Sequence, residues 1–209
     1  MSTDTKQVVT EEKPVEEKPA AKPAAKPAAK PAAKPAAKPA AKPVELHAFE
    51  KSISDKVVEK FGDKIQVEFV KENRVGIKVN REDVHDVAEF IRDGLNYDHV
   101  ESVSGVDYPQ DKEIEVVYHI GSYSDSSLAK QILVLTTRAQ REENPIPGKD
   151  ATKLPTLRDI FYSVEFHERE VFEMFGVYFT GHPDNRRLLL PEDWADLPPL
   201  RKDFAIKGR

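Results

Sequence analysis

Two stretches of the chain place apolar residues at the spacing of an amphipathic helix. In the first, over residues 46–61, apolar positions recur every three or four residues, and Gly62 suits a C-terminal cap. In the second, Asn80 suits an N-cap and Gly94 suits the end of the helix. The apolar face of this second helix comprises Val84, Val87, Ala88 and Ile91. The pattern predicts one helix before residue 62 and another between residues 80 and 94.

Five segments have the composition and alternation of β-strands. IQVEFV and RVGIKV, residues 65–70 and 74–79, flank KEN and predict a hairpin. Three further β-prone segments follow: SVSGVDYP, EIEVVYHIGS and KQILVLTTRA. Apolar and polar residues alternate in EIEVVYHI and ILVLTT, which predicts a sheet with one face covered.

A third helical segment, residues 167–175 (HEREVFEMF), follows a proline- and glycine-rich loop and ends at Gly176. Residues 181–184 (GHPD) are typical of a turn. The last 30 residues carry Pro183, Pro191, Pro198 and Pro199 and predict an extended, irregular arm over about 180–209. Its apolar residues (RLLLPEDWADLPPL) favour either an interface with a partner or packing on its own domain.

The order of elements is α–β–β–α–β–β–β, followed by one helix and the arm. Strands with helices set against them form an α+β domain. We therefore predict an α+β fold with a mixed or antiparallel sheet packed with helices, plus the extended C-terminal arm. Residues 44–209 have the usual size of one domain.

Residues 1–43 have a different composition, because the unit AAKP repeats from Ala20 to Pro43. A proline at every fourth position prevents an α-helix and predicts a disordered, polyproline-like tether. The alternative is a basic segment that contacts nucleic acid or anionic lipid. The tail holds nine lysines and five acidic residues, a net charge of +4. The whole chain carries −5, so residues 44–209 carry −9. An acidic body argues against nucleic acid as the main partner.

The chain contains no cysteine, which excludes disulfides, thiolate zinc sites and cysteine-ligated iron–sulfur clusters from these 209 residues. No run approaches the roughly 18 apolar residues that span a bilayer, and the N-terminus has no apolar signal core. We therefore expect any membrane contact to be made through other chains. The nucleotide-binding patterns GxGxxG and GxxxxGK[ST] and the hydrolase elbow GxSxG are absent, so we expect no cofactor site of the chain's own.

Residues 167–187 (HEREVFEMFGVYFTGHPDNRR) hold the densest set of charged side chains, and a metal site is one interpretation. His167 and Glu170 lie three residues apart, Glu173 follows one turn later, and His182 and Asp184 come from the turn. A metal-dependent hydrolase built on His167, Glu170 and Glu173 is therefore one hypothesis. The zinc-protease pattern HExxH is absent, however.

The other interpretation is a charged scaffold. Arg169 lies among glutamates and offers an ion-pair network, and Met174 beside aromatic residues is typical of a core position. Arg186 and Arg187 either remain in water or form bidentate pairs with carboxylates. The residues by themselves leave both interpretations open.

The order of residues then becomes specific. The segment EREVFEMFGVYFTGHPDNRRLLLPEDW, followed by PLRKDF, resembles the signature of the thirty-kilodalton (C-type) subunit of respiratory complex I. Upstream, VDYP, EVVYHI and LPTLRDIF are also similar to that family. The matching signature residues are Glu168, Arg169, Glu170, Met174, Phe175, Gly176, Phe179, Gly181, His182, Pro183, Asp184, Arg186 and Arg187. Two positions depart: Glu173 stands where aspartate is usual and Phe166 where tryptophan is usual.

The resemblance implies a non-redox subunit in the hydrophilic arm of a complex I-like oxidoreductase, coupling electron transfer to ion translocation. The implied partners are the forty-nine-kilodalton (D-type) subunit and the iron–sulfur subunits of the B and I types, at the cytoplasmic face of the membrane. Flavin or deazaflavin, iron–sulfur clusters and quinone would then belong to partner subunits. The equivalent subunit of a membrane-bound, energy-converting NiFe hydrogenase is the alternative.

The resemblance implies no catalytic role for any residue of this chain. We expect seven residues to make interface or fold-locking contacts instead. They are Arg169, Glu170, His182, Asp184, Arg186, Arg187 and Arg201.

Overall fold

The computed structural model describes residues 48–206. The predicted tail over residues 1–43, and its boundary with the domain, lie outside the described residues.

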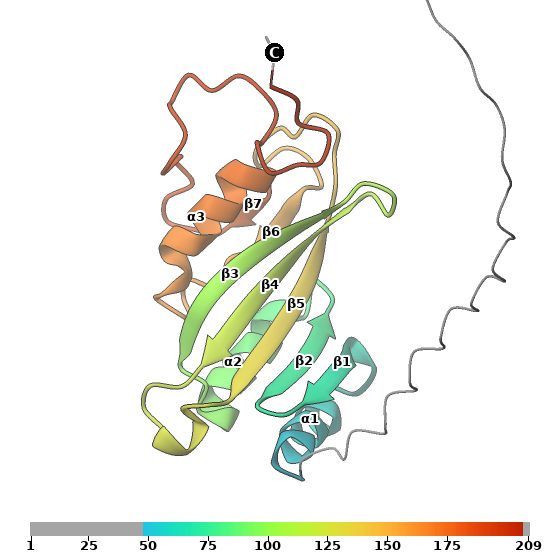
Figure 1. Cartoon of the computed structure of the whole chain (residues 1–209), viewed down its shortest axis with the longest axis vertical. Helices are drawn as coiled ribbons and strands as arrows, with labels where there is room; N and C mark the ends of the chain where they lie inside the picture. Colours follow the sequence, from blue (N-terminus) through green and yellow to red (C-terminus); the bar gives the residue numbers. More distant parts are fainter. Residues whose placement is uncertain (1–47, 207–209) are drawn as a thin grey trace, which may run out of the picture. The chain divides into compact units, whose positions relative to one another are not determined.

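Five strands form one mixed sheet in the order β1-β2-β5-β4-β3 (Figure 1). β1 (Ile65–Lys71) and β2 (Arg74–Val79) form the predicted antiparallel hairpin. β2 then pairs in parallel with β5 (Ile132–Gln140). β4 (Glu113–Gly121) lies antiparallel between β5 and β3 (His99–Tyr108). The α+β prediction with a mixed sheet is confirmed.

α1 (Ala48–Phe61) packs against β1 and β2 and ends, as predicted, before Gly62, whose φ is +53°. A short 3-10 helix, η1 (Gly62–Lys64), connects it to β1. A second 3-10 helix, η2 (Ser126–Leu128), lies between β4 and β5.

α2 (Val84–Leu95) differs from the prediction at both ends. Asp83, not Asn80, precedes its first residue, because Asn80 belongs to a turn in which its carbonyl accepts the Asp83 amide at 3.1 Å. Gly94 lies inside the helix, where the Phe90 ring packs over it one turn earlier. Asn96 at φ 59° ends the helix instead, since asparagine also tolerates the left-handed conformation.

The predicted alternation is confirmed along β4, where it builds the core. Along β5 it is wrong, because the five successive residues 133–137 are all buried and β5 is therefore covered on both faces. Ile114, Val116, Tyr118 and Ile120 of β4 are all at most 1% exposed. They share one cluster with the apolar residues of α1 and α2. Burial of each such side chain stabilises the fold by roughly 1.5–3 kcal/mol.

α3 (Val164–Phe175) lies beside β3 at the edge of the sheet (Figure 1). Two contacts hold it there: Ser163 Oγ accepts the Val100 amide at 3.1 Å, and the Phe175 ring packs where Gly105 has no side chain. Gly176 at φ +81° ends the helix as predicted.

Two strands were not predicted, β6 (Lys153–Pro155) and β7 (Tyr178–Thr180), which pair in parallel in a small second sheet. Three residues are too few to show alternation, so the sequence pattern carried no signal for them. From residue 181 to 206 the chain contains no helix or strand, which confirms the irregular arm for that described part.

Candidate functional site

Glu168 is the buried centre of the signature segment, residues 168–187. Its carboxyl group accepts hydrogen bonds from the Tyr118 hydroxyl (3.2 Å), the Thr156 hydroxyl (2.5 Å) and the Leu157 amide (2.9 Å). Burial nevertheless raises the pKa of Glu168 to about 7, against the lowering effect of these donors. Burial also raises the pKa of Tyr118 well above its ordinary value. The carboxyl group thus joins α3 to β4 and to the loop after β6.

His182 fixes the turn between β7 and the arm. Its Nε2 donates to the Glu165 carbonyl at 3.0 Å, and its Nδ1 accepts the Asp184 amide at 3.0 Å. One donating and one accepting nitrogen is the pattern of a neutral imidazole. His182 is buried, and its Nε2 lies 4.0 Å from a Glu168 oxygen. Both of its nitrogens are used within the fold, which leaves neither for a metal.

Glu173 holds the arm against the outer side of α3. Its buried carboxylate accepts the backbone amides of Leu188 (3.1 Å), Leu189 (2.9 and 3.0 Å) and Leu190 (3.0 Å). Three successive amides that converge on one carboxylate form an anion-binding concavity. Glu173 therefore locks the arm in place.

Arg169 and Arg187 make the matching contacts with backbone carbonyls. Arg169 donates through Nε to the Arg186 carbonyl at 2.9 Å and through Nη2 to the Arg187 carbonyl at 3.0 Å. Arg187 donates to the carbonyls of Pro191 and Glu192, each at 3.0 Å, and of Trp194 at 2.8 Å. The planar guanidinium fork can reach several carbonyls at once, which an ammonium group cannot.

Asp184 and Arg186 form a pair on the surface. Both Asp184 oxygens accept from the Arg186 guanidinium at 2.9 Å, and Arg169 lies 3.5 Å away. The hydrogen bond from Arg186 holds the pKa of Asp184 well below its ordinary value. The Arg186 side chain is 85% exposed, so this pair contributes little to the fold itself and is available to a partner.

Arg201, in the PLRKDF element, is buried at the end of α3. Its Nε donates to the Phe175 carbonyl at 2.6 Å and its Nη1 to the Glu142 carbonyl, while Nη2 has no hydrogen-bond partner among residues 48–206. Burial lowers the pKa of Arg201 from its ordinary value. The same element is held at Asp107, which accepts the Lys202 amide at 2.8 Å and pairs with Arg141 at 2.6 Å.

The structure does not bring the five candidate metal ligands together. Glu173 accepts hydrogen bonds from backbone amides of the arm, and both ring nitrogens of His182 form hydrogen bonds with backbone groups. Within residues 48–206, no group of three His, Cys, Asp or Glu side chains is placed to hold a metal ion. The metal-dependent hydrolase hypothesis therefore has no site in the described part of the chain.

Six of the seven predicted contact residues bind other parts of the same chain, and Glu170 is the exception. Glu170 is exposed on α3 and has no hydrogen bond or ion pair within the described residues. A role for Glu170 in locking the fold thus finds no support, and a role at an interface stays a prediction.

These contacts join a helix, a turn and an arm whose residues match a known family. The model of the 30 kDa subunit of respiratory-chain NADH dehydrogenase matches residues 77–209. The chain belongs to this family. The resemblance seen in the signature segment is confirmed.

Relatives within this family come from several complexes. The C subunit of the F420H2 dehydrogenase of Methanosarcina mazei is 35% identical over 131 residues, 63% of this chain and 75% of that protein. The NADH-quinone oxidoreductase C subunit of Chlorobium phaeobacteroides is 35% identical over 156 residues, 73% of this chain and 87% of that protein. The NADH-quinone oxidoreductase C/D subunit of Phocaeicola vulgatus is 35% identical over 61% of this chain and 22% of that protein.

A solved structure supports the same fold. A chain of the membrane-bound sulfane sulfur reductase, an archaeal respiratory membrane complex, superposes with a TM-score of 0.60 at 27% identity. The superposition covers 75% of this chain and 86% of that one. Among the helices described here, none is long and apolar enough to cross a bilayer.

The sequence placed Glu168 only in an ion-pair network with Arg169, and it offered Glu173 as a possible metal ligand. The ion-pair prediction is wrong, because Arg169 binds backbone carbonyls of the arm and pairs with Asp184. The partners of the two glutamates lie on other elements: Tyr118 is 50 residues before Glu168, and the arm amides are 15 to 17 residues after Glu173. The signature match was the one signal that marked Glu168, but it did not say what the carboxyl group contacts.

Proposed function

We propose that this chain is a non-redox structural subunit of the hydrophilic arm of a complex I-like oxidoreductase. The observation that carries the proposal is the use of the signature side chains within this family's fold. Four signature side chains form hydrogen bonds with the chain's own backbone and with two buried hydroxyl groups: Glu168, Glu173, Arg169 and Arg187. Such contacts fix the helix, the turn and the arm relative to one another. These side chains therefore serve the fold and are not directed at a reacting molecule.

The partner we propose first is the D-type subunit, the forty-nine-kilodalton protein that the family resemblance implies. The Phocaeicola vulgatus relative supports it, because its name assigns both C and D to one chain. Fusion of two proteins keeps them at high effective concentration, which is useful where they bind each other. Iron–sulfur subunits of the B and I types are the further partners that we propose.

We also propose that redox chemistry resides in those partners: flavin or deazaflavin, iron–sulfur clusters and quinone. The named relatives belong to an F420H2 dehydrogenase and to NADH-quinone oxidoreductases, so the family serves more than one electron donor. The chain would reach the cytoplasmic face of the membrane through its partners.

The test is a purification in mild detergent through an affinity tag on the full chain, followed by mass spectrometry of all co-purifying proteins. We expect a D-type protein, iron–sulfur subunits and membrane subunits in fixed ratio to the tagged chain. The donor-side protein would identify the electron donor. Recovery of the chain alone from a sample with intact membranes would refute the proposal.

A further inference from the structure

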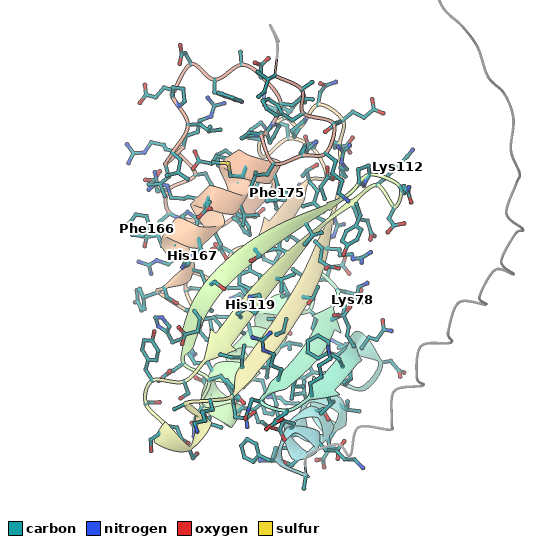
Figure 2. All side chains as sticks on the ribbon, in the orientation of Figure 1. Lys78, Lys112, His119, Phe166, His167 and Phe175 are labelled. Atoms are coloured by element: carbon teal, nitrogen blue, oxygen red, sulfur yellow. The ribbon has the colours of Figure 1, made fainter. Side chains whose placement is uncertain are left out.

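The outer face of α3 carries exposed aromatic side chains that nothing in the described chain covers. Tyr162, in the turn that leads into the helix, is 76% exposed, and Phe166, four residues later, is 57% exposed. Glu170 follows after four more residues and is also exposed. Figure 2 shows Phe166 on the side of α3 away from the sheet, whereas Phe175 lies toward it. Exposed aromatic residues are enriched at protein interfaces.

A guanidinium group lies near each of these two aromatic rings and favours its position through a cation–π contact. The Arg158 guanidinium lies 4.2 Å from the centre of the Tyr162 ring and pairs with Glu165 at 2.8 Å. The Arg169 guanidinium lies 5.9 Å from the centre of the Phe166 ring while it binds the arm. Rings fixed before binding lose less side-chain entropy when a partner covers them.

The exposed surface continues onto the arm. Glu173 lies seven residues after Phe166, on the same face of the helix, and binds the amides of Leu188 and Leu189. These two leucine residues remain 42% and 61% exposed. Helix and arm therefore present one surface, which we call the α3 outer surface: Tyr162, Phe166, Glu170, Leu188 and Leu189.

The charge at this surface indicates what kind of partner fits. The other carboxylates of α3 have partners: Glu165 binds Arg158, Glu168 is buried among donors, and Glu173 binds the arm. Glu170 is the one carboxylate of α3 without a partner in the described chain. A carboxylate beside exposed apolar side chains is complemented by an apolar surface with one arginine or lysine.

We propose that the α3 outer surface docks a neighbouring protein of the complex that offers an apolar patch with a basic side chain facing Glu170. This inference rests on the proposed function, since it assigns the face through which the chain binds within its complex. The body's charge of −9 disfavours an anionic lipid surface and a second copy of the chain as occupants.

The first test makes the α3 outer surface more polar and reverses its charge, in the full chain and within its native complex. The variant F166S/E170R is compared with F49S/E89R, which changes an exposed phenylalanine on α1 and an exposed glutamate on α2. The ratio of co-purifying subunits to tagged chain is measured by quantitative mass spectrometry. We expect a loss of about tenfold or more for F166S/E170R, as for removal of an interface anchor, and less than about twofold for the control.

Equal recovery of other subunits by the two double variants would overturn the assignment of this face. If the unmodified chain recovers no other protein of the complex, the proposed function itself is refuted. Thermal unfolding of each isolated variant shows whether it folds. If F166S/E170R unfolds, F166S alone is measured in its place.

The second test identifies the occupant directly. A photo-crosslinking amino acid replaces Tyr162, which is exposed enough to accept it, and the membranes are irradiated before purification. We expect a cross-link to another protein of the complex, at a segment that contains arginine or lysine. Exchange of that basic residue for glutamate should then restore the recovery lost in E170R. Cross-links to lipid or to a second copy of this chain would overturn the proposal.

Discussion

The carboxylate of Glu173 binds the backbone amide of Leu189 through both of its oxygens, at 2.9 and 3.0 Å. A single side chain near the end of α3 thereby holds an arm that has no regular secondary structure. The arm's own amides replace the water that this buried carboxylate would otherwise need.

Replacement of Glu173 by glutamine should release the arm. The amide side chain accepts with one oxygen only, so part of the set of three backbone donors loses its acceptor. We expect a loss of about 1.5–3 kcal/mol in the free energy of unfolding, the usual magnitude for hydrogen bonds to a charged group. Limited proteolysis of residues 185–200 should accelerate in parallel. Glu170→Gln on the same helix is the control and should change neither quantity.

Glu168 should make stability fall as pH rises. Burial raises its folded pKa to about 7, from an ordinary value of 4.5, so the folded chain binds the extra proton between these values. The stabilising contribution is then complete below pH 4.5 and is lost as pH rises through 7. At about 1.36 kcal/mol per pH unit, the total is on the order of 3 kcal/mol. Glu168→Gln should flatten this slope in urea unfolding measured from pH 4.5 to 8, and an unchanged slope would contradict the assignment.

Gly176 should tolerate alanine less well than Gly62 does. Both have positive φ, +81° and +53°, so each substitution carries a conformational cost of roughly 1 kcal/mol. A Cβ at Gly176 would also lie 2.9 Å from Pro145 and 3.1 Å from Arg201, whereas one at Gly62 meets nothing within 4 Å. We expect Gly176→Ala to lower Tm by several degrees more than Gly62→Ala. Equal shifts would show that Pro145 and the arm residue Arg201 move aside freely.

Arg186→Ala should lower the amount of assembled complex and leave the turnover of assembled complex unchanged. The Arg186 side chain is 85% exposed and its pair with Asp184 lies on the surface, so the isolated chain should unfold at the wild-type temperature. Complex is quantified by native gel electrophoresis, and turnover is expressed per assembled complex. Wild-type amounts of complex with lost turnover would contradict a scaffolding role.

Arg187→Lys should loosen the arm, in contrast to a change at the exposed Arg186. One ammonium group cannot replace the guanidinium that binds the carbonyls of Pro191, Glu192 and Trp194. We expect faster proteolysis of the arm for Arg187→Lys and unchanged proteolysis for Arg186→Lys.

Local features of the sequence were enough to predict α1, α2, α3, the five long strands and the irregular arm, because helical spacing, strand composition and prolines act over a few neighbouring residues. The predicted ends of α2, at Asn80 and Gly94, were wrong, because a turn at Asn80 and packing of Phe90 over Gly94 set the actual ends. β6 and β7 were not predicted, since three residues are too few to show a period. The order of residues in the signature segment indicated the family, and the family model confirmed it.

Only the tertiary structure distinguished the glutamates of α3 from one another. In the sequence, Glu168, Glu170 and Glu173 are three carboxylates on one helix. In the fold, the first is buried against Tyr118, the last is enclosed by amides of the arm, and the middle one faces outward. The difference arises because the partners of Glu168 and Glu173 are residues 11 to 50 positions away, whose approach depends on how the sheet and the arm close around the helix.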